Sequence, residues 1–269
     1  MLIDSFLFHN EYDILEGRLE YLNDIVSFFV ISEMDIMFSG KTKELNFPKQ
    51  ISRYRKYLDK IIYLPYSPET SNLDFSVKPD KMDFSTAHWI VENGQRNNLM
   101  KGLRFFSPND FVMISDVDEI PLKSAIRSSL ENINKKRFAI SFEQEMFYYN
   151  FNQRQVNNWY GSVITTNQKV FENMPQWFRD NRWSLPKITK GGYHLSYWNT
   201  PELIRDKVIN FAHQELNDEE YTNIDKIVYR IKNNQDLFDR KENPFTKVDT
   251  ETIDKEIYKI FKTYEKNNI

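Results

Sequence analysis

Two carboxylates, Asp116 and Asp118, directly follow an apolar run at residues 111–114. Alternate residues of an extended segment point to the same face, so we expect both side chains to reach one cation while Val117 turns into the core. Mg²⁺ and Mn²⁺ take oxygen ligands and fill their remaining positions with water and phosphate oxygens, so a nucleotide diphosphate would fit here. The alternative is an acidic turn that only caps a strand, with Glu119 as a solvated residue at its edge.

The apolar run belongs to a series of short strands that alternate with helices. The predicted strands are residues 2–8, 28–32, 60–64, 111–115 and 138–142. Apolar residues at helical spacing predict a helix after the first strand, capped by Asn10, and a second helix at residues 86–103. This alternation predicts an α/β fold built on a single open, mostly parallel sheet with helices on both faces. Such sheets bind ligands at the carboxyl ends of their strands, where Asp116 and Glu33 lie.

The second half of the chain has a different pattern. Residues 143–193 are rich in aromatic residues and Asn and carry few helical signals, so we expect irregular strands and loops around the site. After Thr200 the chain turns helical, with Pro201 suited to a first turn. An apolar stripe over residues 253–264 predicts a closing helix.

Composition excludes several classes of protein. The 269 residues suit one domain, and 36 basic against 39 acidic residues give a formal net charge of −3, so we expect no nucleic-acid partner. The absence of cysteine excludes disulfides, thiolate nucleophiles and cysteine zinc sites. No segment approaches the roughly 20 apolar residues of a spanning helix, and no signal peptide or anchor is visible. We therefore expect a soluble, cytoplasmic protein without a transmembrane segment.

Several short blocks resemble a known family in content and order. They are residues 4–11, 15–16, 18–19, 29–33, 38–41, 115–121, 191–196, 201–202 and 207. Together they resemble glycosyltransferase family 17 over roughly residues 4–240. The resemblance implies a GT-A-like nucleotide-sugar-binding fold, a UDP-sugar donor, a divalent metal ion, and inversion at the sugar carbon. The first choice of reaction is transfer of N-acetylglucosamine from UDP-GlcNAc to a hydroxyl of a glycan acceptor.

Under this resemblance, the acidic motif and a late histidine form the metal site. Asp118 is the best metal ligand, while Asp116 reaches the metal, its bound water or the nucleotide ribose. His194 completes the metal shell, as a late histidine commonly does in GT-A-like enzymes, and the two glycines before it let the backbone pass close to a ligand. His213, on a predicted helix, is the alternative ligand.

Three further residues are candidates for nucleotide contacts. Lys207 and Arg96 are candidates for the diphosphate, Arg96 because its helix directly precedes the metal strand. Glu33 closes the second strand and could hydrogen-bond uracil or ribose, or serve only as a turn carboxylate. Exposed, solvated side chains are the alternative for Lys207 and Arg96.

Inversion by a single displacement needs a base near the acceptor hydroxyl. Asp180 is the first choice, because it lies between the acidic motif and His194 in the order usual for GT-A-like enzymes. Glu145 is the second, and a salt-bridged loop around Asp180 is the alternative. A few aromatic rings could stack against acceptor sugars, although most should lie in the core. The candidates are Phe147, Tyr148, Tyr149, Trp159, Tyr160, Trp177 and Trp183.

The resemblance divides the single domain into three parts. Residues 1–125 form the nucleotide-sugar-binding half, residues 126–200 the acceptor side, and residues 201–269 the C-terminal helices. Two other functions remain open: a metal-dependent nucleotidyltransferase or phosphohydrolase, which would usually need a further acidic cluster for a second metal, and a non-catalytic carbohydrate-binding protein on the same fold.

Overall fold

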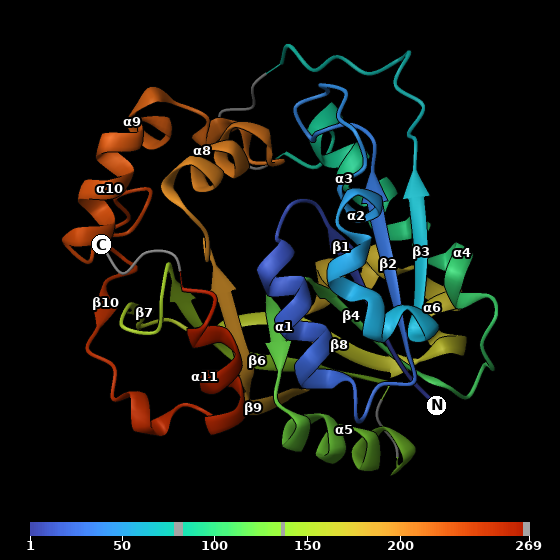
Figure 1. Cartoon of the computed structure of the whole chain (residues 1–269). Coiled ribbons are helices and arrows are strands. Elements are labelled where there is room, and N and C mark those ends of the chain that lie inside the picture. Colours follow the sequence, from blue (N-terminus) through green and yellow to red (C-terminus); the bar gives the residue numbers. More distant parts are fainter. Residues whose placement is uncertain (78–82, 136–137, 266–269) are drawn as a thin grey trace.

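The computed structural model of the chain describes residues 1–77, 83–135 and 138–265. Within these residues a ten-stranded sheet has the order β10-β7-β6-β8-β4-β1-β2-β3, and β9 pairs with β5 and β6 (Figure 1). The strands are β1 Leu2–Phe8, β2 Phe28–Met34, β3 Ile61–Tyr66, β4 Phe111–Asp116, β5 Glu119–Pro121, β6 Ala139–Tyr148, β7 Arg154–Gln155, β8 Trp159–Thr166, β9 Lys187–Ser196 and β10 Phe245–Thr246.

The first four long strands are parallel. β1 pairs with β2 and β4, and β2 pairs with β3, so the carboxyl ends of all four lie at one edge of the sheet. Phe8 pairs with Glu33, and Leu7 with Asp116, which brings these predicted site residues to neighbouring strand ends. Beyond β4 the sheet is mixed, because β8 runs antiparallel to both β4 and β6, whereas β9 is parallel to β6.

Helices cover both faces of the sheet, so the predicted GT-A-like α/β fold class is confirmed. The expectation of a mostly parallel sheet was wrong, because among the described residues four strand pairs are parallel and five are antiparallel. On one face α1, α5 and α11 pack around Leu19, Ile126 and Phe261, and on the other α6 and α7 contribute Val170 and Phe178. The helices are α1 Tyr12–Leu22, α2 Asn46–Lys49, η1 Ile51–Lys60, α3 Ala87–Asn98, α4 Met100–Leu103, α5 Lys123–Lys135, α6 Asn167–Asn173, α7 Pro175–Asn181, α8 Pro201–Asn210, η2 Gln214–Leu216, α9 Glu219–Thr222, α10 Ile224–Lys232, η3 Thr250–Thr252 and α11 Lys255–Lys262. In the part of the chain that the structure describes, no helix is long and apolar enough to cross a bilayer.

The helical segment after residue 200 is confirmed for α8 to α11, and residues 266–269 lie outside the described part. The closing helix α11 packs against α1. A Cβ on Gly17 of α1 would lie only 2.6 Å from the nearest atom of the Phe261 ring, so glycine leaves the room that this ring needs. Figure 1 shows α8 to α10 beside the carboxyl-end edge of the parallel strands. The C-terminal segment therefore closes the side of the molecule where a ligand is expected.

The start of α1 differs from the prediction. Glu11, not Asn10, is the N-cap residue. The Glu11 carboxylate accepts hydrogen bonds from the backbone nitrogens of His9 and Asn10, both at 3.1 Å. The Asn10 side chain instead donates to Asp206 on α8, at 3.1 Å. The end of β1 is thereby tied to the C-terminal helices.

Residues 143–193 are more regular than predicted. β6, β8 and β9 contain ten, eight and ten residues, and α6 and α7 lie between β8 and β9. The expected loops are mostly strands and helices, because many aromatic residues of this segment are strand residues that fill the core. The expected irregularity is found in β6, whose pairing with β8 and β9 shifts register between residues 141 and 144. Phe147, Tyr148 and Tyr149 are buried, whereas Trp177 and Trp183 are 37% and 47% exposed.

The two glycines before His194 allow strands, rather than a ligand, to approach closely. Gly192 has a φ of +148°, and a Cβ there would lie 2.2 Å from the Ile120 carbonyl oxygen on β5. A Cβ on Gly191 would lie 2.8 Å from the Cβ of Phe142 on β6. β9 can therefore pair with both β5 and β6 because these two positions carry no side chain.

Candidate active site

The acidic motif forms a turn at the carboxyl edge of the sheet. β4 ends at Asp116, residues 117 and 118 form the turn, and β5 begins at Glu119. The expectation that extended backbone presents Asp116 and Asp118 on one face was therefore wrong, although Val117 does turn into the core. As a result, each carboxylate has its own set of cationic partners.

Asp116 lies between two guanidinium groups. Its Oδ1 is 2.7 Å from Arg96 Nη1, and its Oδ2 accepts from Arg179 Nη2. Burial raises the pKa of Asp116, but the charges of Arg179 and Arg96 outweigh it and hold this pKa well below its usual range. Arg96 is buried and also binds Glu92 and Gln176, at 3.0 and 2.9 Å. Asp116 therefore stays ionised at neutral pH.

Asp118 faces a lysine and a histidine. Lys207 Nζ lies 3.0 Å from its Oδ2, and His194 Nε2 lies 3.4 Å from its Oδ1. Burial raises the pKa of Asp118, but Lys207 and His194 lower it well below its usual range. Burial lowers the pKa of Lys207, yet Asp118 and Glu11 raise it above its ordinary value. The structure thus brings together three of the residues predicted for the site.

Glu119 is fully buried, so its interpretation as a solvated residue was wrong. Its Oε1 accepts hydrogen bonds from Trp159 Nε1 at 2.7 Å and Arg179 Nη1 at 2.6 Å, and its Oε2 accepts from the Asp116 backbone nitrogen at 3.0 Å. Gly161 makes room for this carboxylate, because a Cβ on residue 161 would lie 2.5 Å from the carboxyl carbon of Glu119. Glu119 therefore fixes the turn and holds Arg179 against Asp116.

The buried guanidinium group of Arg18, on α1, binds the backbone of the turn. Arg18 Nη1 donates to the backbone carbonyls of Asp116 and Val117, both at 3.3 Å, and to that of Glu119. Asp4 on β1 neutralises Arg18, and neither side chain is exposed. The sequence contains the signal for this pair, because each charge interrupts an apolar pattern: Asp4 in a buried strand, and Arg18 within the apolar stripe of α1.

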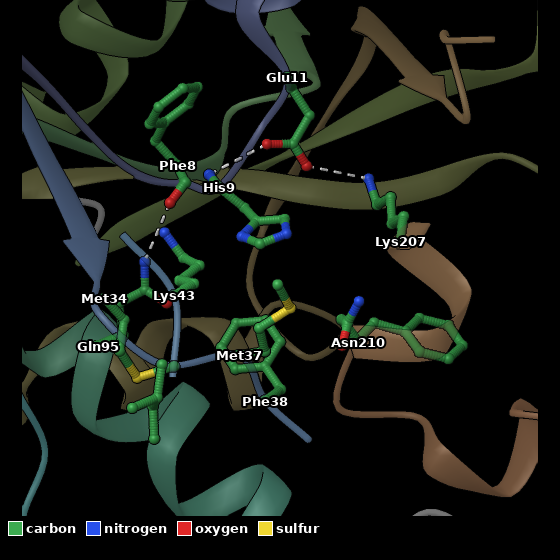
Figure 2. Close-up of a pocket in the computed structure, with 12 residues that line it drawn as sticks. Phe8, His9, Glu11, Met34, Met37, Phe38, Lys43, Gln95, Lys207 and Asn210 are labelled. Atoms are coloured by element: carbon green, nitrogen blue, oxygen red, sulfur yellow. Dashed lines mark hydrogen bonds and ion pairs between the residues drawn. The ribbon is translucent and has the colours of Figure 1, made fainter. Parts of the chain in front are cut away.

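A pocket of about 400 Å³, open to solvent, lies at the carboxyl ends of β1 and β2. Its lining residues are Phe8, His9, Glu11, Met34, Ile36, Met37, Phe38, Lys43, Gln95, Lys207, Asn210 and Phe211. Figure 2 shows Glu11 between the His9 backbone nitrogen and Lys207, whose Nζ is 3.4 Å from the Glu11 carboxylate. Glu11 and Lys207 also line a second pocket that includes Asp118. The two residues therefore connect the larger pocket to the acidic turn.

The His9 ring also lines the larger pocket. Burial lowers the pKa of His9, so the ring is mainly neutral at neutral pH. Its Nε2 is buried and has no hydrogen-bond partner within residues 1–77, 83–135 and 138–265. Asp206 Oδ2 is the nearest carboxylate oxygen, 4.0 Å from that nitrogen.

Glu33 lies at the predicted strand end and is fully buried among donors. Its carboxylate accepts from Lys43 Nζ at 2.7 Å, the Phe47 backbone nitrogen and the Tyr63 hydroxyl, both at 2.9 Å, and the Asn46 backbone nitrogen. These bonds hold the loop between β2 and α2. A contact with uracil or ribose stays a prediction.

The two candidate bases lie in different surroundings. Asp180 is exposed on α7, and its Oδ1 accepts from Gln176, which itself binds Arg96; these bonds are 2.8 and 2.9 Å long. Glu145 pairs with Arg154 at 2.7 Å. Glu145 stands opposite Tyr193 in the β6–β9 register, one position before the His194 pair, so it points to the other face of the sheet from His194.

His213 lies apart from the acidic turn. It is the N-cap residue of η2 rather than part of a helix, and its Nδ1 lies 2.7 Å from Glu215. Its ring packs against Trp89, with ring centroids 4.8 Å apart. His194, and not His213, is therefore the histidine beside Asp118.

Comparisons with known proteins identify the family. The family model described as glycosyltransferase family 17 matches residues 1–264. The β-1,4-mannosyl-glycoprotein 4-β-N-acetylglucosaminyltransferases of Rattus norvegicus and Homo sapiens are each 22% identical over 236 residues, covering 78% of this chain. The match covers 42% of the rat protein and 43% of the human protein, so this chain spans less than half of their length.

A solved structure of 4-diphosphocytidyl-2C-methyl-D-erythritol synthase from Anaerococcus prevotii is 9% identical, covers 81% of this chain and 96% of its own, and has a TM-score of 0.44. That likeness is too distant to indicate what this chain binds. The match to the family model instead extends over the acidic turn, His194 and Lys207. The chain belongs to glycosyltransferase family 17.

Proposed function

We propose that this chain is a metal-dependent, inverting glycosyltransferase that transfers N-acetylglucosamine from UDP-GlcNAc to a hydroxyl of a glycan acceptor. Family membership supports the reaction class, and the names of the rat and human relatives support the sugar. The observation that carries the proposal is the position of Asp118. It lies at the carboxyl edge of the parallel strands, between His194 and Lys207 and beside a pocket.

The larger pocket is the proposed site of the donor nucleotide. Like small-molecule sites, it combines an apolar lining with a few polar groups. Lys207 lies between this pocket and Asp118, so its ammonium group is placed to contact a diphosphate that spans both. Arg96 would act indirectly, because its guanidinium group is buried against Asp116.

Asp118 and His194 are the residues that would hold the divalent cation. Asp118 Oδ1 and His194 Nε2 are 3.4 Å apart and both side chains are nearly buried, so one ion could contact both. Two protein ligands suit an ion whose other positions are filled by water and phosphate oxygens. When bound, the ion would stabilise the negative charge of the departing UDP. Asp116 is occupied by Arg96 and Arg179, and we assign it to positioning these guanidinium groups.

Asp180 is the proposed base. In a single displacement it would accept the proton of the acceptor hydroxyl as that oxygen forms its bond to the sugar carbon. Its exposure leaves it open to an acceptor, and its bond to Gln176 links it to the residues around Asp116. Glu145 is the second choice, because it points to the opposite face of the sheet from His194.

Calorimetric titration of UDP and UDP-GlcNAc, with Mn²⁺ and then with a chelator, tests the proposal. We expect binding that requires the metal, and its loss in Asp118→Ala with an unchanged circular dichroism spectrum. Binding of free sugars, together with no binding of UDP or UDP-GlcNAc under either condition, would favour a non-catalytic carbohydrate-binding protein. Among the residues that the structure describes, no group of three or more His, Asp or Glu side chains gathers as a metal site, so a two-metal nucleotidyltransferase or phosphohydrolase has less support.

A further inference from the structure

Arg182, just after α7, lies against an aromatic cluster beside the acidic turn. Its Cζ is 5.2 Å from the centre of the Trp159 ring and 5.3 Å from that of Trp183. Tyr160 packs against Trp183, with ring centroids 4.9 Å apart, and Lys187 Nζ lies 4.4 Å from the centre of the Tyr160 ring. We call these five residues the Arg182 cluster.

The Arg182 cluster adjoins the proposed catalytic residues through one side chain. Trp159 donates to Glu119, and its ring centroid lies 5.2 Å from that of His194. Trp183 is 47% exposed, so the cluster opens to solvent on its outer side. Only the Trp159 ring would therefore lie between His194 and a molecule bound on Trp183 and Arg182.

Arg182 differs in its partners from Arg96 and Arg179, the two arginines that bind Asp116. Arg96 and Arg179 each contact two carboxylates. Arg182 donates from Nη1 to the Arg179 backbone carbonyl, and within the described parts of the chain it forms no ion pair. Its Nε is buried and has no hydrogen-bond partner among those residues.

The charges around Arg182 explain why a partner would bind there. Burial and the nearby charge of Arg179 lower the pKa of Arg182 to about 9. The group therefore still carries its charge at neutral pH, but it is desolvated and lies beside a like charge. An anion that accepts hydrogen bonds from the guanidinium group would relieve both effects, and carboxylates and phosphates match its planar geometry.

We propose that the Arg182 cluster binds the acceptor through an acidic sugar, one that carries a carboxylate or a phosphate group. The sugar ring would pack against the exposed Trp183, and Arg182 would bind the anionic group. Lys187 would add a second positive charge at the outer edge of the cluster. The inference rests on the proposed transferase function, because it names the acceptor class of the same site.

Matched pairs of small saccharides test the proposal. Methyl β-D-glucuronide is compared with methyl β-D-glucoside, and glucose 6-phosphate with glucose, by fluorescence titration and by saturation-transfer NMR. We expect at least one charged sugar to bind about tenfold more tightly than its neutral match. The two pairs show whether a carboxylate or a phosphate is preferred.

Variants then assign that preference to Arg182. Arg182→Gln should abolish the preference, and Arg182→Lys, which keeps the charge, should keep part of it. Arg104→Gln is the matched control: it removes an exposed guanidinium group, 4.9 Å from the Phe105 ring centre, outside the Arg182 cluster. Loss of structure in Arg182→Gln alone would reduce binding of charged and neutral sugars alike, so the ratio of the two affinities is the readout.

Equal binding of charged and neutral sugars by the unmodified protein, or no binding of either, would overturn the proposal. A preference that survives in Arg182→Gln would overturn it as well. UDP is titrated in the same samples with Mn²⁺. If UDP does not bind, the proposed donor chemistry fails while the saccharide result still stands; if Arg182→Gln weakens UDP as much as the acidic sugar, Arg182 serves the donor.

Discussion

Arg18 and Asp4 form a bidentate ion pair beside the acidic turn. The Nε–Oδ2 distance is 2.8 Å and the Nη2–Oδ1 distance is 2.7 Å. Neither side chain is exposed to solvent. The remaining nitrogen of Arg18 donates only to backbone carbonyls of the turn. The positions of Asp116 and Asp118 therefore depend on a charge pair that is buried away from any substrate.

Asp4→Asn should lower the free energy of unfolding by about 3–5 kcal/mol, because it leaves the buried Arg18 charge without a counterion. Equilibrium denaturation measures this change. Asp13→Asn is the control, since the Asp13–Arg53 pair is partly exposed and its loss should cost under about 1 kcal/mol. Equal effects of the two substitutions would contradict the role given to Asp4.

Lys207→Met should weaken UDP binding by about ten- to a hundredfold in calorimetric titration. Without the ammonium group, the carboxylates of Asp118 and Glu11 would repel a diphosphate at the connection between the two pockets. Lys226→Met removes an exposed lysine paired with Glu220 on the C-terminal segment and should leave UDP affinity unchanged. Unaltered UDP binding in Lys207→Met would limit Lys207 to a structural role.

Asp180→Asn should keep UDP-GlcNAc binding and lose transfer by about a hundredfold or more, because the amide cannot accept the acceptor proton. Binding is measured by calorimetry, and transfer by the release of UDP with an accepted glycan. Asp180→Asn keeps an oxygen that can accept from Gln176, so α7 should stay in place. Normal transfer in this variant would pass the role to Glu145 or to another group.

Gly192→Ala should destabilise the protein by about 2–4 kcal/mol. The added methyl group meets the Ile120 carbonyl oxygen at 2.2 Å, and the backbone there has a φ of +148°. Thermal unfolding reports the loss of stability. Because β9 carries His194 and β5 begins at Glu119, the same change should also weaken metal-dependent UDP binding. An unchanged melting temperature would show that β5 and β9 can separate without cost.

Stability should fall in acid partly through the acidic turn. The pKa values of Asp116 and Asp118 are depressed in the folded protein, so below an unfolded pKa of about 4 the unfolded chain binds protons that the folded chain does not. The stabilisation is thus present above that pH and is lost as the pH falls. Between pH 6 and pH 3.5, the free energy of unfolding should fall less in the double variant Asp116→Asn/Asp118→Asn than in the unmodified protein, as measured by denaturation at both pH values. Asp59→Asn, at an exposed position, should behave like the unmodified protein.

The parallel half of the sheet follows from the sequence because its strands are continuous apolar runs. The predicted bounds of β1, residues 2–8, match the structure, and the other parallel strands begin within one residue of their predicted starts. The antiparallel half was harder, because strand and loop patterns both contain the Asn and aromatic residues of residues 143–193. Only tertiary packing shows that Phe147 is core and that Trp183 is not.

The gathering of His194 and Lys207 around Asp118 was predicted from the sequence, whereas the partners of Asp116 and Glu119 were not. Asp118, His194 and Lys207 meet as expected from their place in the matched blocks. The contact of Arg179 with Asp116 was not predicted, because nothing in the sequence around Arg179 indicates that α7 packs beside the acidic turn. The role of Glu119 was likewise not predicted. Its partner Trp159 lies on β8, and nothing in the sequence near Glu119 indicates that β8 packs beside it.

The order of the chain also bears on how the site forms during folding. Glu11 belongs to the first loop, whereas His194 and Lys207 come from β9 and α8, so the contacts around Asp118 close very long loops. Contacts of high sequence separation are gained late and slowly. A growing chain can pair β1, β2 and β4 on the ribosome, but Asp118 lacks His194 until β9 emerges and lacks Lys207 until α8 emerges. The acidic turn should therefore acquire its final geometry only after α8 has been synthesised.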